Sequence, residues 1–156
     1  MQRLNAMEDF RRDISHHLLK RGDGTVLLTA TMRDSFHDVV LEVVVDAVPL
    51  TIAEARVDFR KSPSDTCGNV ASRLDQLIGM TIGPGMTRRL MAALGGGEGC
   101  GNLRNLLQGL LPLVLNLSAA AGIHDEQEML DAMHERLQGT CVGYVRPVPT
   151  RKSDDS

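Results

Sequence analysis

The chain has 156 residues and a formal net charge of −3, and its 42% hydrophobic and 24% charged residues are typical of one globular domain. The slight acidic excess argues against a nucleic-acid-binding protein, because such proteins carry an excess of Lys and Arg. Three Phe, one Tyr and no Trp also leave few aromatic rings on which bases could stack.

No membrane or export segment is expected. The opening MQRLNAMEDFRRD is too polar for the hydrophobic part of a signal peptide. The longest hydrophobic stretch, around residues 106–121, is broken by polar residues and a proline and is too short to cross a bilayer. The sequence therefore predicts a soluble cytoplasmic protein with reduced cysteines, which binds neither membranes nor nucleic acid.

The first 22 residues fit two structures. Phe10, Ile14 and Leu18 recur at the spacing of a helix, and they fit the alternation of a strand equally well. The segment 21–24, Arg-Gly-Asp-Gly, is a strong turn signal and ends this region.

Three strands are predicted next, because hydrophobic and polar residues alternate over three consecutive segments. In the third segment Ala55, Val57 and Phe59 share one face, and Ile52 falls on the opposite face. Short connections between the segments favour an antiparallel meander with one solvated face. The segments are 25–34, 37–46 and 51–59.

After Pro63 the hydrophobic period becomes helical. The first helix is predicted to begin after Asp65 or Thr66, with Val70, Leu74, Leu77 and Ile78 facing inward. A short helix over 86–94 follows, and a third helix begins near residue 103 and is kinked or restarted by Pro112.

The fourth helix is predicted over 124–137. Asp125 and Glu128 have the spacing of a capping box, and the stripe expected to be buried consists of Met129, Leu130, Met133 and Leu137. Strands followed by helices predict the α+β class: a three- to four-stranded antiparallel meander with about four helices packed on one face. We expect a single domain over residues 1–140 and a polar, disordered tail over 141–156.

The stretch LGGGEGCGNL, residues 94–103, is the most unusual part of the chain. Five glycines indicate backbone that needs room or uncommon dihedral angles. The loop delivers Cys100 to the start of a hydrophobic helix, where free N–H groups and the helix dipole favour a thiolate. This loop is therefore a candidate site.

Two cysteines and a histidine could form a metal site. Cys67 and Cys100 are both predicted at helix starts on the same sheet, and His37 and Asp38 begin a strand at its edge. Thiolates and imidazole are ligands for zinc, iron or an iron–sulfur cluster, so His37, Cys67 and Cys100 are the predicted metal ligands. No CxxC or HxxxH spacing supports this hypothesis, and the alternative is that each cysteine is a small buried hydrophobic residue.

The glycine loops also suggest an enzyme that acts on a small anionic or carbonyl substrate. GPGMTRR and GGGEGCGN both place backbone N–H groups before a helix, where phosphate or an oxyanion could bind. Under this hypothesis the candidate catalytic residues are His37, Asp38 and Cys100, with His37 or Asp38 as the base. The residues predicted to bind the ligand or cofactor are Gly97, Gly99, Asn102 and Arg88.

Five motifs occur in order along the chain: HDVVLEVVVD, TIAEARVDF, SPSDTCGN, LIGMTIGPGMTRRL and LGGGEGCGNLRNLL. In this order they resemble the bacterial DUF2889 family, a family of unknown function, over about residues 10–121. The family has His-Asp-Met where this chain has His37-Asp38-Val39. A more distant likeness, in the order of elements only, is to iron–sulfur scaffolds of the IscU/NifU type.

The resemblance implies a shared site at His37, Cys67 and Cys100. The family has Gly-Cys-Thr-His-Leu where this chain reads Gly99-Cys100-Gly101-Asn102-Leu103. An asparagine cannot act as a base and is a poor ligand for soft metals. Either the site uses the other three residues, or its activity has been lost or changed.

Three hypotheses follow. The first is a small metal- or iron–sulfur-associated accessory protein with a His/Cys/Cys site. The second is the enzyme described above, which requires one pocket bounded by both glycine loops. The third is a non-catalytic ligand-binding or interaction module, including a homodimer formed through an edge strand or the last helix.

Overall fold

The protein is described by a computed structural model that covers residues 8–119 and 121–145. The chain divides into two compact units, Met1–Leu115 and Asn116–Ser156, and the single domain expected over residues 1–140 stays a prediction. The first unit contains the whole sheet.

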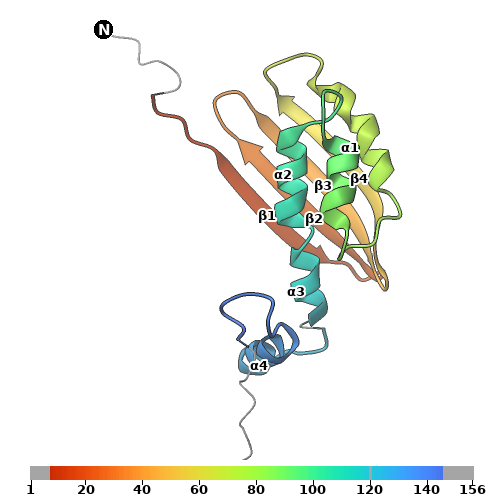
Figure 1. The fold of residues 1–156 in the computed structure, drawn as a ribbon, viewed down its shortest axis with the longest axis vertical. Helices are drawn as coiled ribbons and strands as arrows, with labels where there is room; N and C mark the ends of the chain where they lie inside the picture. The colour runs from red at the N-terminus through yellow and green to blue at the C-terminus, as the bar shows by residue number, and fades with distance from the viewer. Residues whose placement is uncertain (1–7, 120, 146–156) are drawn as a thin grey trace, which may run out of the picture. The chain divides into compact units, whose positions relative to one another are not determined.

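A four-stranded antiparallel sheet in the order β1-β2-β3-β4 forms one layer of this unit (Figure 1). The predicted meander is confirmed, and the ambiguous N-terminal segment forms its first strand. Each strand pairs with the next one along the chain, so the two edges are β1 and β4. The strands are β1 (Asp13–Lys20), β2 (Thr25–Arg33), β3 (Asp38–Ala47) and β4 (Leu50–Lys61).

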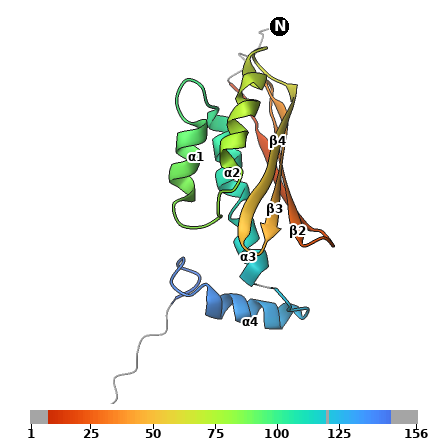
Figure 2. The same cartoon turned by 90° about the vertical axis from the view of Figure 1, so that its right-hand side faces the viewer.

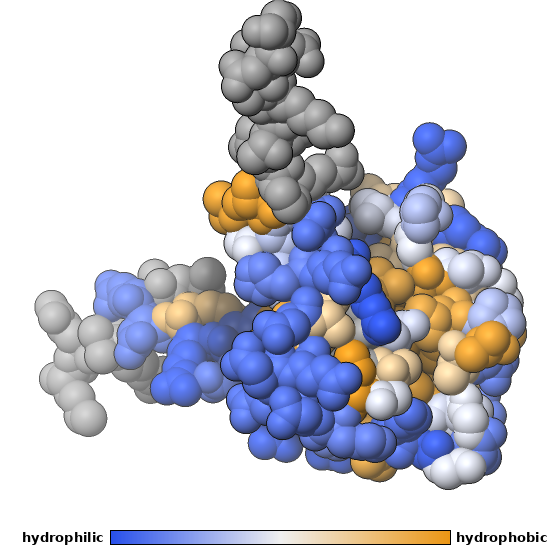
Figure 3. All heavy atoms as spheres, turned by 90° about the horizontal axis from the view of Figure 1, so that it is seen from below, coloured by the Kyte–Doolittle hydropathy of each residue, from blue (hydrophilic) through white to orange (hydrophobic). Residues whose placement is uncertain are grey.

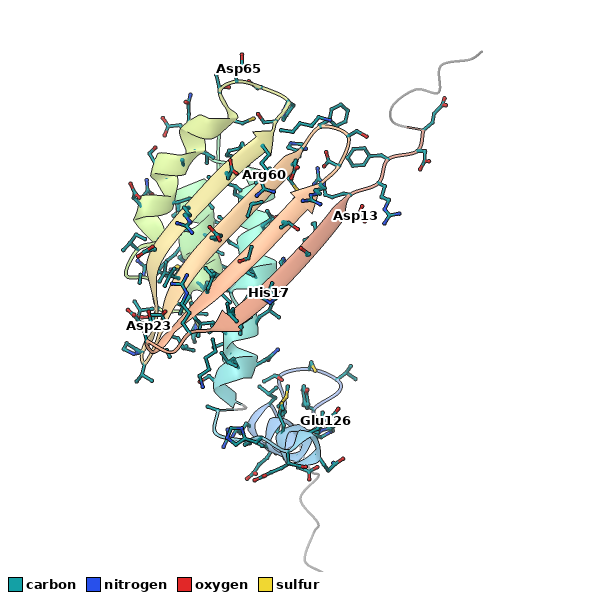
Figure 4. The ribbon with its side chains drawn as sticks, turned by 180° about the vertical axis from the view of Figure 1, so that it is seen from behind. Asp13, His17, Asp23, Arg60, Asp65 and Glu126 are labelled. Carbon is teal, nitrogen blue, oxygen red and sulfur yellow. The ribbon has the colours of Figure 1, made fainter. Side chains whose placement is uncertain are left out.

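Helices cover one face of the sheet and leave the other face open (Figures 2 and 4). The covering helices are the 3₁₀ helix η1 (Cys67–Leu77), α1 (Met86–Leu94) and α2 (Gly101–Leu110). The alternation read from the sequence places every second side chain of β2 and β3 in the core. These buried residues are Val26, Leu28, Ala30, Met32, Val39, Leu41, Val43 and Val45.

One strand departs from the predicted alternation. The pairing of β3 with β4 shifts between Val44 and Val45, since Val44 faces Glu54 whereas Val45 faces Ile52. This β-bulge adds one residue, Ala53, to β4, so the side chains before and after it no longer alternate in phase. Ile52 is therefore buried on the same face as Val57, and its predicted placement on the solvated face was wrong.

The predicted helices occur, with local differences at their ends. The first begins after Thr66, whose side chain makes no capping hydrogen bond, and buries Val70, Leu74 and Leu77. Ile78, predicted to face inward, lies just after η1 in extended backbone and is 43% exposed. Pro112 separates α2 from α3 (Leu113–Ala119), as predicted, because proline lacks the N–H that a helix interior needs.

The second unit contains α4 (Glu126–Arg136), which begins as predicted. The Asp125 carboxylate accepts a hydrogen bond from the backbone N–H of Glu128 at 2.9 Å. No residue of α4 is buried, and Leu130 is 50% exposed, so the expected buried stripe on this helix was wrong. Residues 146–156 of the expected tail lie outside the described residues.

Hydrophobic side chains also reach the surface elsewhere, as the orange areas among blue ones in Figure 3 show. The most exposed large ones are Val48 and Val142. None of the helices in the described part of the chain combines the length and hydrophobicity that a membrane crossing requires.

Candidate functional site

A cavity of about 650 Å³ lies between η1 and the glycine loop. Cys67 lines it from the first residue of η1, and Cys100 lines it from the residue that precedes α2. Both thiols are free and half-buried. The structure thus places in the lining of one cavity the two cysteines that the sequence singled out. The full lining is Thr66, Cys67, Asn69, Val70, Ser72, Arg73, Gly97, Glu98, Gly99 and Cys100.

The glycine loop is tightly folded against the end of α1. The backbone N–H of Cys100 donates to the carbonyl of Leu94 at 3.0 Å. A Cβ atom on Gly99 would lie only 2.0 Å from that carbonyl oxygen, so no larger residue fits there without backbone movement. Gly96 has a φ of 70°, a conformation that glycine adopts readily. The loop therefore needs glycine at these positions in order to present Cys100 to the cavity.

Arg73, on η1, bonds to the end of α1 and to the glycine loop. Its Nε donates to the backbone carbonyl of Ala93 at 2.9 Å, at the end of α1. One of its terminal nitrogens lies 3.4 Å from the Glu98 carboxylate in the glycine loop. Because Glu98 is mostly exposed, this ion pair is weak, and its main effect is to hold the Arg73 side chain in the lining of the cavity.

His37 belongs to a second cluster, in which four side chains are linked in a closed ring. The Arg12 Nε donates to Asp34 at 2.7 Å, and another nitrogen of Arg12 donates to the Asn102 carbonyl at 3.0 Å. The Asn102 amide nitrogen lies 3.3 Å from Nε2 of His37, and Nδ1 of His37 lies 2.9 Å from Asp34. This Arg12–Asp34–His37–Asn102 network connects the segment before β1, the β2–β3 turn and the start of α2.

Asp34 is the centre of the network, and its side chain has no exposed surface. Its carboxylate also accepts the backbone N–H groups of Phe36 and His37, each at 2.8 Å, which shapes the turn. Burial works against ionisation, but the hydrogen bonds from Phe36, His37 and Arg12 hold the pKa of Asp34 well below its usual range. The carboxylate therefore stays charged at neutral pH.

The network determines which ring nitrogen of His37 carries the hydrogen. Because Arg12 donates to the Asn102 carbonyl oxygen, the amide NH₂ of Asn102 must face His37. Nε2 of His37 then accepts that hydrogen bond, and Nδ1–H donates to Asp34. Both ring nitrogens are engaged, and the ring is only 14% exposed. This arrangement orients the ring but leaves it no free lone pair to act as a base.

The other predicted site residues are distributed more widely. The Asp38 carboxylate pairs with Arg33 of the neighbouring strand, at 3.4 Å. Arg88 is exposed on α1 and does not line the cavity, whereas Gly97 and Gly99 do. The loop at residues 83–85 precedes α1 and the other glycine loop follows it, so the two lie at opposite ends of a nine-residue helix. The cavity between η1 and the glycine loop is lined by residues 97–100 and not by residues 83–85, and the enzyme hypothesis stays a prediction.

The described residues contain no group of three or more His, Cys, Asp or Glu side chains that could hold a metal ion. His37, Cys67 and Cys100 are thus not assembled as a ligand set in this structure. Cys67 and Cys100 share the cavity, while His37 is held by Asp34 and Asn102. Metal binding by the cysteines stays a prediction.

Sequence reasoning missed Arg12, Asp34, Arg73 and Glu98. A local signal existed for one of them, since an aspartate at the start of a turn often accepts the backbone N–H groups two and three residues later. The arginines had no such signal, because their partners are distant in sequence and become neighbours only when the helices pack on the sheet.

These features define an α+β protein with an antiparallel meander, helices on one face, and a cavity large enough for a small ligand. Over residues 10–115 the sequence matches the family described as Protein of unknown function (DUF2889), and the chain belongs to this family. The match confirms the family inferred from the motifs and ends somewhat before residue 121. No curated protein and no solved structure matches the chain.

Proposed function

We propose that the protein binds a small ligand in the cavity between η1 and the glycine loop, and that this ligand is a soft metal ion or a metal cluster. The observation that carries the proposal is that Cys67 and Cys100, from separate segments of the chain, line one cavity as free thiols. Thiolates are the protein ligands that soft and borderline metals such as zinc prefer.

The environment of the two thiols supports this proposal. Both are half-buried, which limits their contact with solvent, and the cavity is open enough for a metal to enter. The carboxylate of Glu98 belongs to the same lining but is paired with Arg73, so the two thiols are the proposed ligands. Two thiolates leave coordination positions for a small molecule or a partner protein, which suits an accessory role in metal handling.

Cobalt provides a direct test, because cobalt–thiolate bonds absorb in the near ultraviolet. Reduced protein kept without oxygen should bind about one equivalent of Co²⁺ with this absorption, and Zn²⁺ should displace it. Cys67→Ser and Cys100→Ser should each weaken binding more than about tenfold. Cys141→Ser is the matched control, since this exposed thiol is not part of the cavity. Binding that survives both cavity substitutions would contradict the proposal.

A second candidate is covalent chemistry on a small electrophilic molecule, with Cys100 as the nucleophile. Two observations favour it: the cavity is far larger than a metal ion, and Cys100 immediately precedes the ten-residue helix α2. This candidate predicts that iodoacetamide modifies Cys100 faster than Cys67 and that Cys67→Ser leaves the rate unchanged. The metal proposal predicts instead that zinc protects both thiols from modification.

A further inference from the structure

One edge of the sheet is free over much of its length. β4 is the last strand, and the backbone N–H of Ile52 and the backbone carbonyls of Leu50 and Ile52 bond with residues 79–82. Among the described residues, no strand or isolated bridge pairs with the outer edge of residues 54–60. An unpaired edge of this kind can accept another strand through its backbone N–H and C=O groups.

The open face of the sheet carries charges of alternating sign along this edge. Beyond the bulge at Ala53, the exposed side chains of β4 are, in order, Glu54, Arg56, Asp58 and Arg60. Arg60 lies at a second register shift, since Val39 pairs with Phe59 and Asp38 with Lys61. Figure 4 shows this face, with Arg60 near the end of β4 and no helix packed on it. The side chains between them face the helices and are apolar and half-buried: Ala55, Val57 and Phe59.

We propose that a second copy of the chain pairs with this edge, β4 against β4 in antiparallel orientation. Val57 then lies directly opposite the partner's Val57, across the two-fold axis. In this register Glu54 lies opposite the partner's Arg60, and Arg56 lies opposite the partner's Asp58. Every charged side chain of the segment 54–60 then faces an opposite charge. Direct cross-strand neighbours on one face of an antiparallel pair are close enough to interact.

The charges also exclude the neighbouring registers. A shift of two residues in one direction places Arg56 opposite the partner's Arg56. The same shift in the other direction places Asp58 opposite the partner's Asp58. A shift of one residue is excluded as well, because it would turn the apolar face of one strand toward solvent. The pattern therefore specifies one register rather than a general tendency to associate.

Two further features fit this register. On the helix-facing side, the large Phe59 lies opposite the small Ala55 of the partner, so their volumes are complementary. On the open face, Arg56 already bonds to Glu42 of β3 at 2.6 Å. Its other neighbour would be the partner's Asp58, a carboxylate that lies 3.3 Å from Arg60 of its own strand. Arg56 would thus stand between two carboxylates, as in a cross-strand ladder of alternating charge.

Charge reversal gives a specific test by sedimentation equilibrium on the full chain. Glu54→Arg alone places like charges at both symmetry-related contacts, and so does Arg60→Glu alone. Each variant should dimerise at least about tenfold more weakly than the wild type. Mixing the two variants places Arg opposite Glu at both contacts, so the mixture should form a heterodimer with an affinity close to that of the wild type. This recovery also proves that both variants are folded.

Two outcomes would overturn the proposal. One is a wild-type protein that stays monomeric up to about 0.1 mM. The other is a dimer that both charge reversals leave intact but Ile14→Lys dissociates. Ile14 is half-exposed on β1, so that second result would assign self-association to the opposite edge of the sheet.

Discussion

The Asn102 amide donates to Nε2 of His37 at 3.3 Å, and this contact joins the start of α2 to the turn between β2 and β3. Asn102 stands two residues after Cys100, so one short segment contributes a residue to the cavity and a residue to the Arg12–Asp34–His37–Asn102 network. The amide occupies the lone pair that a catalytic histidine would need.

Asn102→Ala should free Nε2 of His37 and destabilise the protein by about 1 kcal/mol, because one hydrogen bond to Arg12 and one to His37 are lost. In the wild type, nitrogen-15 spectra of the imidazole should show the Nδ1–H tautomer. Asn105→Ala is the control, since Asn105 is exposed one turn further along α2. A wild-type ring with hydrogen on Nε2 would contradict the proposed direction of these bonds.

Asp34→Asn should lower the free energy of unfolding at pH 7 by about 2–4 kcal/mol, because it removes a buried charge that Arg12 and His37 bond to. The pKa of Asp34 is depressed in the folded state. Its stabilising effect is therefore full above the unfolded value of about 4 and declines as the pH falls below it.

Denaturant titrations from pH 7 to pH 2 measure this effect. The difference between wild type and Asp34→Asn should shrink at the acid end. Asp38→Asn should change little at any pH, since the Asp38–Arg33 pair is more exposed. Equal effects of the two substitutions would show that Asp34 has no special role.

Gly99→Ala should lower the free energy of unfolding by about 2–4 kcal/mol, because the new Cβ would overlap the carbonyl group of Leu94. Gly97→Ala in the same loop should change stability by no more than about 0.5 kcal/mol, since nothing lies within 4 Å of its Cβ position and its φ is not left-handed. Thermal unfolding compares the two. If the substitutions had equal effects, the loop would not be packed as described.

His16 packs against Gly109 on α2, and a Cβ atom on Gly109 would lie 2.6 Å from the imidazole ring. Gly109→Ala should therefore raise the free energy of unfolding by less than the roughly 1 kcal/mol that alanine normally adds in a helix, or should lower it. In a His16→Ala background the same substitution should stabilise by about that full amount. A double-mutant cycle measures the difference, which should be about 1–2 kcal/mol. Additive effects would show that β1 and α2 do not touch there.

Much of the fold could be predicted because alternation and helical spacing are local patterns. β2 and β3 followed directly from them, and so did the break at Pro112 and the cap at Asp125. The bulge in β4 could not be predicted, because an extra residue between Ile52 and Glu54 leaves no mark in composition.

The site was predicted only in part. Cys67 and Cys100 were found because glycine-rich backbone before a helix is a local signal, and both line the cavity. The role of His37 was not predictable, because its partners Arg12 and Asn102 are far apart in sequence. The stripe on α4 had the correct spacing but is not buried, which shows that amphipathic spacing does not by itself provide a packing partner.

The match to the family and the first compact unit both end at residue 115. Among the described residues, every hydrophobic side chain that is fully buried lies at or before Val114. Substitutions, insertions or replacement of residues 121–145 should therefore be tolerated without repacking the sheet and its helices.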